Sequence, residues 1–267
     1  GSGPRRKPLR CLAMRHEYVG DEGDYAKVAL LTALSRGKQL GVNWYLTVHE
    51  EPLKDDGDLR DHLHAEDEWA HLDATLLRRM VETLRDLDKD DRHIELLEPL
   101  LPGAIFFDEG LPTGDIPVGE RLTARKAWSA RALAHLAGAD LVFLDPDNGF
   151  EVPSLGERER TRCKFANYAE VAAYLARGQA VVAYQHRPRE TWTSLVAKKK
   201  AQMVQHRVPT APPGFIAFGS RGFFLMHRDP AEVAGLTRRA QAVKEACDEE
   251  GWTKLKIDVI PPEPHAR

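Results

Sequence analysis

One short apolar run constrains the fold of this chain more than any other feature. Residues 141–144 (LVFL) lie between Asp140 and Asp145 with no polar residue among them. A continuous apolar run of this length is typical of a strand that is buried on both faces, as in the middle of a parallel sheet. We therefore expect residues 140–145 to form a central strand.

Helical and strand patterns alternate along the rest of the chain. Predicted helices cover residues 25–36, 66–88, 121–137, 167–177, 191–205 and 230–250. Predicted strands cover residues 41–48, 94–97, 104–107, 180–184, 214–218, 222–226 and 255–260. Asp24 is the expected N-cap of the first helix, and Gly37 closes it. This alternation predicts an α/β protein with a Rossmann-like, doubly wound, mostly parallel sheet and a C-terminal antiparallel strand pair.

The length of 267 residues and the absence of internal repeats favour one α/β domain over residues 16–267, after a flexible basic tail over residues 1–15. No apolar run reaches the roughly 20 residues that a membrane helix needs, and no signal-peptide core is visible. The three scattered cysteines argue against a disulfide framework. We expect a cytoplasmic protein that does not contact the membrane.

The charges are unevenly distributed, although the net charge is only -3. Residues 16–115 hold 24 acidic side chains and 10 basic ones. Residues 184–228 hold 8 basic side chains against Glu190 alone. A basic stretch beside an acidic body either receives a polyanion such as nucleic acid or is a solvated face with scattered counter-charges.

Polar side chains are concentrated directly after the predicted central strand. Asp145-Pro146-Asp147-Asn148-Gly149 is followed by Phe150 and Glu151. Ligands of open α/β sheets bind beyond the carboxyl ends of the strands, which is where this segment lies. A turn alone needs at most one capping side chain, so three carboxylates and an amide predict a chemical role for Asp145, Asp147 and Asn148.

Two further segments carry candidate functional residues. Residues 18–27 (YVGDEGDYAK) lead into the first helix, whose N-terminal amides attract anions; the alternative is a capped helix start with a solvated Lys27. Residues 184–189 (YQHRPR) follow the strand that we place beside the central one. His186 there is a candidate general base or phosphate contact, or else a structural histidine. Residues 198–200 (KKK) and Arg207 are most simply a solvated helix face, and weak phosphate binding is the alternative.

Several well-known sites are missing from the sequence. It contains no P-loop, no nucleophile elbow and no GxGxxG fingerprint, and its histidines lack metal-ligand spacing.

These segments, taken in order, resemble the class I S-adenosylmethionine-dependent methyltransferase superfamily. The nearest pattern is that of the bacterial ribosomal RNA adenine-N6 methyltransferases, in which a Gly and an Asp-x-x-Lys precede the first helix and the catalytic strand ends in Asp-Pro-Pro-Tyr. Gly20, Asp24 and Lys27 match the start, and Asp145 with Pro146 matches half of the later motif. The chain is still more similar to an uncharacterised bacterial group with Y-x-G-D-x-G-D-x-x-K, D-P-D-N-G and a late R-x-F-F, which begins here at Arg221.

The resemblance implies a role for most of these residues. S-adenosylmethionine would bind near Tyr18, Gly20, Asp21, Asp24 and Lys27. Asp145 would accept hydrogen bonds from the target amine, Asn148 would orient it, and Asp147 and His186 would complete the catalytic group. The substrate would be nucleic acid or a nucleotide, contacted by Lys164, Arg187, Arg189 and Arg221.

The sequence departs from the family at two places. No glycine-rich loop follows residues 41–48, and Asp147-Asn148 replaces Pro-Tyr, so that the aromatic side chain expected to stack on a flipped base is missing. Two alternatives therefore remain beside the methyltransferase. One is a nuclease or phosphohydrolase with Mg²⁺ or Mn²⁺ on Asp145, Asp147 and Glu151. The other is a nucleic-acid-binding module without a cofactor.

Overall fold

A computed structural model describes residues 19–47, 59–88, 91–112, 116–156 and 159–263; the predicted tail over residues 1–15 lies outside these ranges. The α-helices are α1 (Glu22–Leu34), α2 (Glu66–Leu84), α3 (Arg121–His135), α4 (Tyr168–Ala176), α5 (Trp192–Gln205) and α6 (Pro230–Glu249). The strands are β1 (Leu40–Asn43), β2 (Ile105–Phe107), β3 (Leu141–Leu144), β4 (Gly149–Phe150), β5 (Phe165–Ala166), β6 (Ala180–His186), β7 (Gly214–Phe218), β8 (Arg221–Met226) and β9 (Ile257–Ile260). Short 3₁₀ segments are η2 (Asp61–Leu63), η4 (Ile94–Leu96), η5 (Glu98–Leu100), η6 (Leu136–Gly138) and η7 (Arg160–Lys164).

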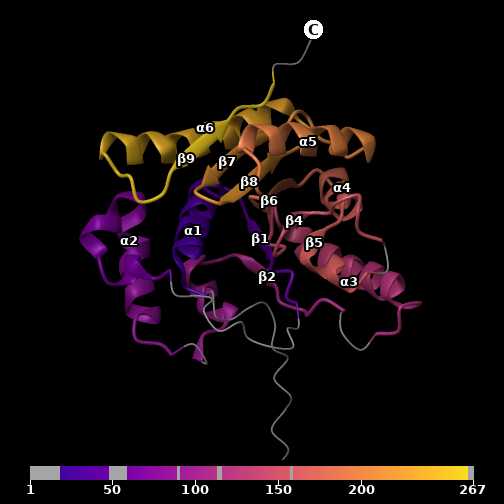
Figure 1. The fold of residues 1–267 in the computed structure, drawn as a ribbon, viewed down its shortest axis with the longest axis horizontal. Coiled ribbons are helices and arrows are strands. Elements are labelled where there is room, and N and C mark those ends of the chain that lie inside the picture. The colour runs from indigo at the N-terminus through magenta and orange to yellow at the C-terminus, as the bar shows by residue number, and fades with distance from the viewer. Residues whose placement is uncertain (1–18, 48–58, 89–90, 113–115, 157–158, 264–267) are drawn as a thin grey trace, which may run out of the picture.

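Seven of these strands form one mixed sheet in the order β2-β1-β3-β6-β8-β7-β9 (Figure 1). The strands from β2 to β6 run parallel, whereas β8, β7 and β9 are each antiparallel to the strand before them in this order. β3 has a neighbour on each side, and Leu144 of β3 lies opposite Ala183 of β6 in parallel register. The predicted central strand, its parallel neighbour and the antiparallel pair are confirmed. The antiparallel part is larger than predicted because β9 joins it.

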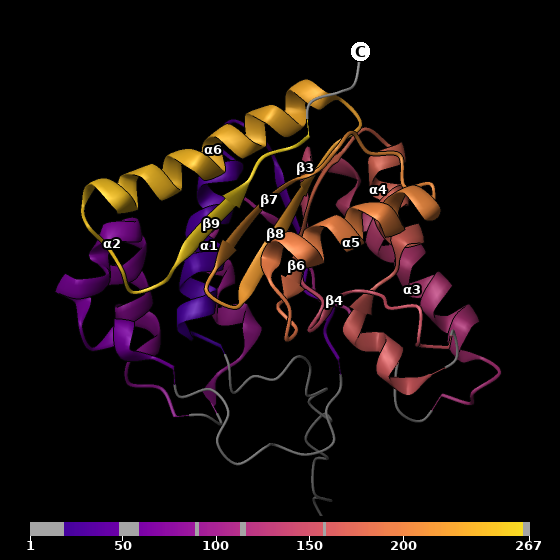
Figure 2. The same cartoon turned by 45° about the horizontal axis from the view of Figure 1, so that its top comes forward.

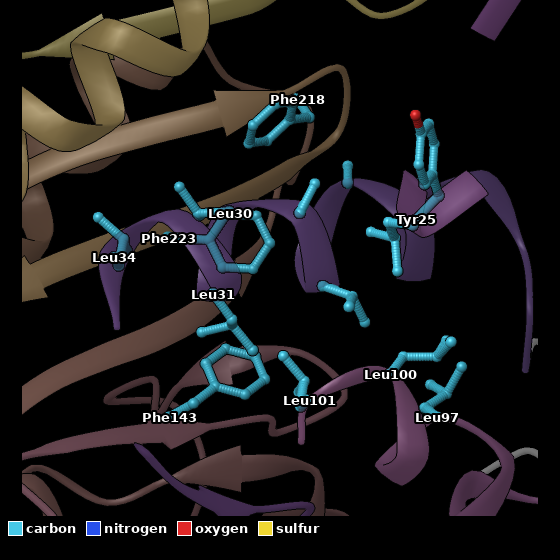
Figure 3. Close-up of a cluster of buried hydrophobic side chains, with 14 of the residues drawn as sticks. Tyr25, Leu30, Leu31, Leu34, Leu97, Leu100, Leu101, Phe143, Phe218 and Phe223 are labelled. Atoms are coloured by element: carbon cyan, nitrogen blue, oxygen red, sulfur yellow. The ribbon is translucent and has the colours of Figure 1, made fainter. Parts of the chain in front are cut away.

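Helices cover both faces of the sheet: α1, α2 and α6 lie on one side, and α3, α4 and α5 lie on the other (Figure 2). Successive residues of β3 alternate between the two cores, with Phe143 in one and Leu144 in the other. In the first core, Leu30 and Leu31 of α1 approach Phe223 and Phe143 (Figure 3). Both leucines are fully buried, and burying such a side chain contributes roughly 1.5–3 kcal/mol. This packing fixes the N-terminus of α1 beside the carboxyl end of β3.

The structure corrects several local predictions. The strand predicted over residues 41–48 is shorter and covers Leu40–Asn43. Residues 94–97 are not a strand: Ile94–Leu96 form a 3₁₀ turn, which buries Ile94 and Leu97 at i,i+3 spacing against the first core. The first helix starts at Glu22, because Asp21 rather than Asp24 is its N-cap. The helix predicted over residues 66–88 ends at Leu84 and is kinked at Asp73, whose backbone amide donates to the hydroxyl of Tyr25.

The described part of the chain is thus a mixed α/β structure with a seven-stranded sheet. None of its helices is both long enough and apolar enough to cross a bilayer.

Candidate functional site

A pocket of about 350 Å³ lies where β3 and β6 end. The N-terminal turn of α1 supplies part of its wall, and the turn after β3 supplies the facing part. Because parallel strands end at the same edge of a sheet, the segments after β3 and at the end of β6 meet here although they are distant in sequence. The sequence-based prediction placed the site at this edge.

Lys27 joins the two walls of the pocket. Its Nζ lies 2.7 Å from Oδ2 of Asp145 and 2.9 Å from Oδ1 of Asp24, and all three side chains are buried. The other oxygen of Asp24 accepts a hydrogen bond from the backbone amide of Gly20 at 2.9 Å. Lys27 is therefore not the solvated side chain of the alternative interpretation but the centre of a buried Asp-Lys-Asp group.

A second charged group lies at the start of α1. One oxygen of Asp21 caps the helix by accepting from the amide of Asp24, and the other is 2.5 Å from Nη2 of Arg221. Nη1 of Arg221 lies 3.4 Å from Glu22. The guanidinium passes so close to Gly23 that a Cβ there would lie 1.9 Å from Nε. A larger residue at position 23 would displace the guanidinium, so the ion pair in this geometry requires glycine there.

Burial shifts the acidity of these groups. Burial raises the pKa of Asp145 to about 6, although the Lys27 ammonium lowers it. Burial, followed by the Asp24 carboxylate, likewise raises the pKa of Asp21 to about 6, against the lowering effect of Arg221. Burial alone would lower the pKa of Lys27, but Asp145 and Asp24 outweigh it and hold the pKa above its ordinary value. At neutral pH the Lys27–Asp145 pair is ionised, and its aspartate takes up a proton more readily than a solvated one.

Gln185 fixes the turn that carries Asp147 and Asn148. Its amide nitrogen donates to the carbonyl of Asn148 at 2.9 Å, and its oxygen accepts from the amide of Phe150 at 3.1 Å. Gly149, at φ +97°, makes this possible because a Cβ there would lie 2.4 Å from the Gln185 side chain. Sequence reasoning missed Gln185, since its only sequence signal is its place at the end of a predicted strand.

Lys199 supports the next residues of the same segment. Its Nζ donates to the carbonyls of Phe150 at 3.2 Å and Glu151 at 2.9 Å, and only 2% of the residue is exposed. Burial lowers the pKa of Lys199 to about 8. The expectation of a solvated face over residues 198–200 is therefore wrong for Lys199, which faces the protein interior.

Nine of the predicted site residues line the pocket. They are Asp21, Asp24, Lys27, Asp145, Asp147, Asn148, Lys164, His186 and Arg221. Gly20 contributes through its bond to Asp24 rather than as a lining residue. Arg187 and Arg189 are exposed and follow His186 outside the pocket lining. Tyr18 lies outside the described residues.

The three carboxylates of the alternative metal site do not come together. Glu151 forms an ion pair with Arg162 and accepts from the amide of Tyr168 at 2.8 Å, away from the pocket lined by Asp145 and Asp147. In the described ranges, no group of three or more His, Cys, Asp or Glu side chains is arranged to hold a metal ion. The predicted set of Asp145, Asp147 and Glu151 is therefore corrected.

Two aromatic side chains lie in or next to the segments that line the pocket. Phe150 cannot replace the missing motif tyrosine, because it is buried and stacks on Tyr168 with ring centroids 5.2 Å apart. Tyr184 lines the pocket instead, and its hydroxyl is 3.3 Å from Nδ1 of His186. Burial, Arg221 and Arg187 lower the pKa of His186, so that its imidazole is neutral at pH 7.

Comparisons with known proteins assign no family to this chain. No family model matches it, and no curated protein matches it. A similar solved structure is that of protein LPL1258 from Legionella pneumophila (DUF519), with a TM-score of 0.47 and 10% sequence identity. The alignment covers 91% of this chain and 98% of that one. Similarity at this level carries no argument about function or superfamily.

Proposed function

We propose that this protein is an S-adenosylmethionine-dependent methyltransferase that acts on an amine of nucleic acid or a nucleotide. One observation carries the proposal: Lys27 of the Gly-Asp-rich start contacts Asp145 of the Asp-Pro motif across 118 positions of sequence. The two segments on which the resemblance rests thus form one pocket, at the sheet edge where α/β enzymes bind ligands.

The chemistry of the lining groups fits such a cofactor. S-adenosylmethionine presents an ammonium group, a carboxylate and ribose hydroxyls, which require both acceptors and donors. Asp147 supplies acceptor oxygens, and the hydroxyls of Tyr184 and Ser220, which also line the pocket, can donate. A volume of about 350 Å³ falls within the roughly 300–1,000 Å³ of small-molecule pockets. The target base would then approach from outside the pocket.

The proposed roles use the contacts described above. A bound S-adenosylmethionine would supply an electrophilic methyl group for the amine nitrogen. Asp145 accepts a hydrogen bond from the amine and so orients its lone pair, and Lys27 keeps Asp145 ionised and in place. His186 has a neutral imidazole beside the pocket and takes the proton that the amine loses.

The two alternatives are less well supported. The metal site of the proposed hydrolase lacks its third carboxylate ligand, because Glu151 is paired with Arg162. A binding module without a cofactor gives no account of two aspartates with a raised pKa in one pocket, a feature that is more common at functional sites.

Calorimetric titration of the full chain with S-adenosylmethionine, and separately with MgCl₂, tests the proposal. We expect one cofactor per chain and retention of that binding in Asp145→Asn, since the aspartate serves the target amine. Binding of Mg²⁺ alone, with no heat from S-adenosylmethionine, would transfer the assignment to metal-dependent hydrolysis.

A further inference from the structure

The basic side chains at the pocket fall into two classes. Lys27 and Arg221 each hold two carboxylates: Asp24 and Asp145 in the first case, Asp21 and Glu22 in the second. Lys164 also lines the pocket, yet it makes no ion pair or side-chain hydrogen bond with any residue in the described ranges. The inner cations are thus neutralised by the protein itself, and the ammonium of Lys164 is left for a ligand.

Lys164 is held next to Asn148 by backbone pairing. The amide of Asn148 donates to the carbonyl of Lys164 at 2.9 Å, and directly afterwards Gly149 of β4 pairs with Phe165 of β5. The Asn148 backbone is fixed in turn by Gln185. Both side chains line the pocket, so an ammonium and a carboxamide are presented from one rigid support.

An ammonium and a carboxamide donor that line the same pocket suit an anionic oxygen group. The surroundings favour a phosphate. Arg187 and Arg189 follow pocket-lining His186 and are exposed, and neither makes an ion pair with a described residue. The guanidinium carbon of Arg187 lies over the ring of Trp192, 5.9 Å from the ring centroid. Exposed basic groups that follow a pocket-lining residue in sequence and have no ion-pair partner among the described residues are what a phosphate backbone requires.

We propose that Lys164 and Asn148 form a phosphate-binding subsite, through which the protein distinguishes a nucleotide, free or within a strand, from a nucleoside. The inference rests on the proposed function for the identity of the target, but its test requires no methyl transfer. Lys164 would hold the phosphate of the same nucleotide whose amine donates a hydrogen bond to Asp145.

The test compares binding of adenosine 5′-monophosphate and adenosine to the full chain. The wild-type protein should bind the monophosphate about tenfold more tightly, the effect of one charge-assisted contact. Lys164→Gln should reduce the affinity for the monophosphate to that for adenosine, whereas Lys164→Arg should retain most of it. The matched control is Lys126→Gln, which removes the same charge from an exposed position on α3.

Two further measurements separate the phosphate from other anions. Affinity for a single-stranded oligonucleotide should fall with salt, and the log–log slope should be smaller by about 0.7 in Lys164→Gln. Affinity for S-adenosylmethionine should not change in this variant.

Equal binding of monophosphate and adenosine by the wild-type protein would overturn the inference. So would a Lys164→Gln defect confined to S-adenosylmethionine, because the anion would then be the cofactor carboxylate. Failure of the proposed function itself would instead appear as absence of S-adenosylmethionine binding in the wild-type protein.

Discussion

The Nζ of Lys27 lies 2.7 Å from Oδ2 of Asp145, and this contact connects the first helix to the turn after the central strand. Both residues are at least nine-tenths buried. A buried ion pair is costly to break from one side, because the remaining charge has no partner and little water.

The first prediction concerns removal of that cation. Lys27→Met leaves Asp145 buried without its counter-charge and should lower the free energy of unfolding by about 3–5 kcal/mol. Urea denaturation followed by circular dichroism measures the loss. The double variant Lys27→Met/Asp145→Asn removes both charges and should recover part of the stability. If the two single effects simply add in the double variant, the pair is not coupled as the geometry indicates.

The second prediction concerns the close approach of Gly23 and Arg221. Gly23→Ala places a methyl group where Nε of Arg221 lies, so the guanidinium must move and its pairing with Asp21 weakens. We expect a loss of about 1–3 kcal/mol in thermal or urea unfolding. Gly235→Ala, also within a helix but with only the end of Arg238 within 4 Å, should instead stabilise by about 0.5–1 kcal/mol. A stabilised Gly23→Ala variant would contradict the described contact.

The third prediction concerns pH and Asp145. Its pKa is raised in the folded state from 3.8 to about 6, so between these values the folded protein binds more protons than the unfolded chain. The contribution of Asp145 to stability is therefore greatest below about pH 4 and decreases as the pH rises through about 6, by on the order of 3 kcal/mol. The stability difference between the wild-type protein and Asp145→Asn should fall accordingly in urea titrations at pH 4 to 7. A constant difference would indicate an ordinary carboxyl pKa. Asp21 titrates in both proteins, so its effect largely cancels in the stability difference between them.

The fourth prediction concerns Lys199, whose contribution to stability changes with pH in the opposite direction to that of Asp145. Its pKa is lowered from 10.5 to about 8, so the unfolded chain binds more protons between these values. The wild-type protein should therefore gain stability relative to Lys199→Met as the pH rises from about 8 to 10.5. Lys198→Met, at the exposed neighbouring position, should show no such window. The same pH trend in both variants would contradict the buried position of Lys199.

Local patterns in the sequence predicted much of the fold. The apolar residues 141–144 identified β3, and the alternation of helices and strands placed Asp145 and His186 at one edge of the sheet. Those predictions succeeded because a strand that is buried on both faces has a continuous apolar sequence, and because strands that alternate with helices usually run parallel. The kink at Asp73 was not predictable, since it depends on a hydrogen bond to Tyr25, 48 residues away.

The supporting contacts of the site were also beyond sequence reasoning. Gln185 and Lys199 are ordinary polar residues in a strand and a helix, and only the tertiary fold brings them to the carbonyls of residues 148–151. Glu151 was wrongly grouped with the aspartates because closeness in sequence does not determine where a side chain points after a turn. Its partner, Arg162, comes from the segment before β5.

The central claim, that Asp145 serves methyl transfer from S-adenosylmethionine, is tested most directly by one labelled-methyl assay. The full chain is incubated with methyl-labelled S-adenosylmethionine and nucleic acid, and label incorporation is compared between the wild-type protein and Asp145→Asn after both are shown to bind the cofactor. The account predicts incorporation by the wild-type protein and a loss of about 10²-fold or more in the variant, on the scale of removing one positioned transition-state contact. Equal incorporation by both proteins, or none by a wild-type protein that binds no cofactor, would contradict it.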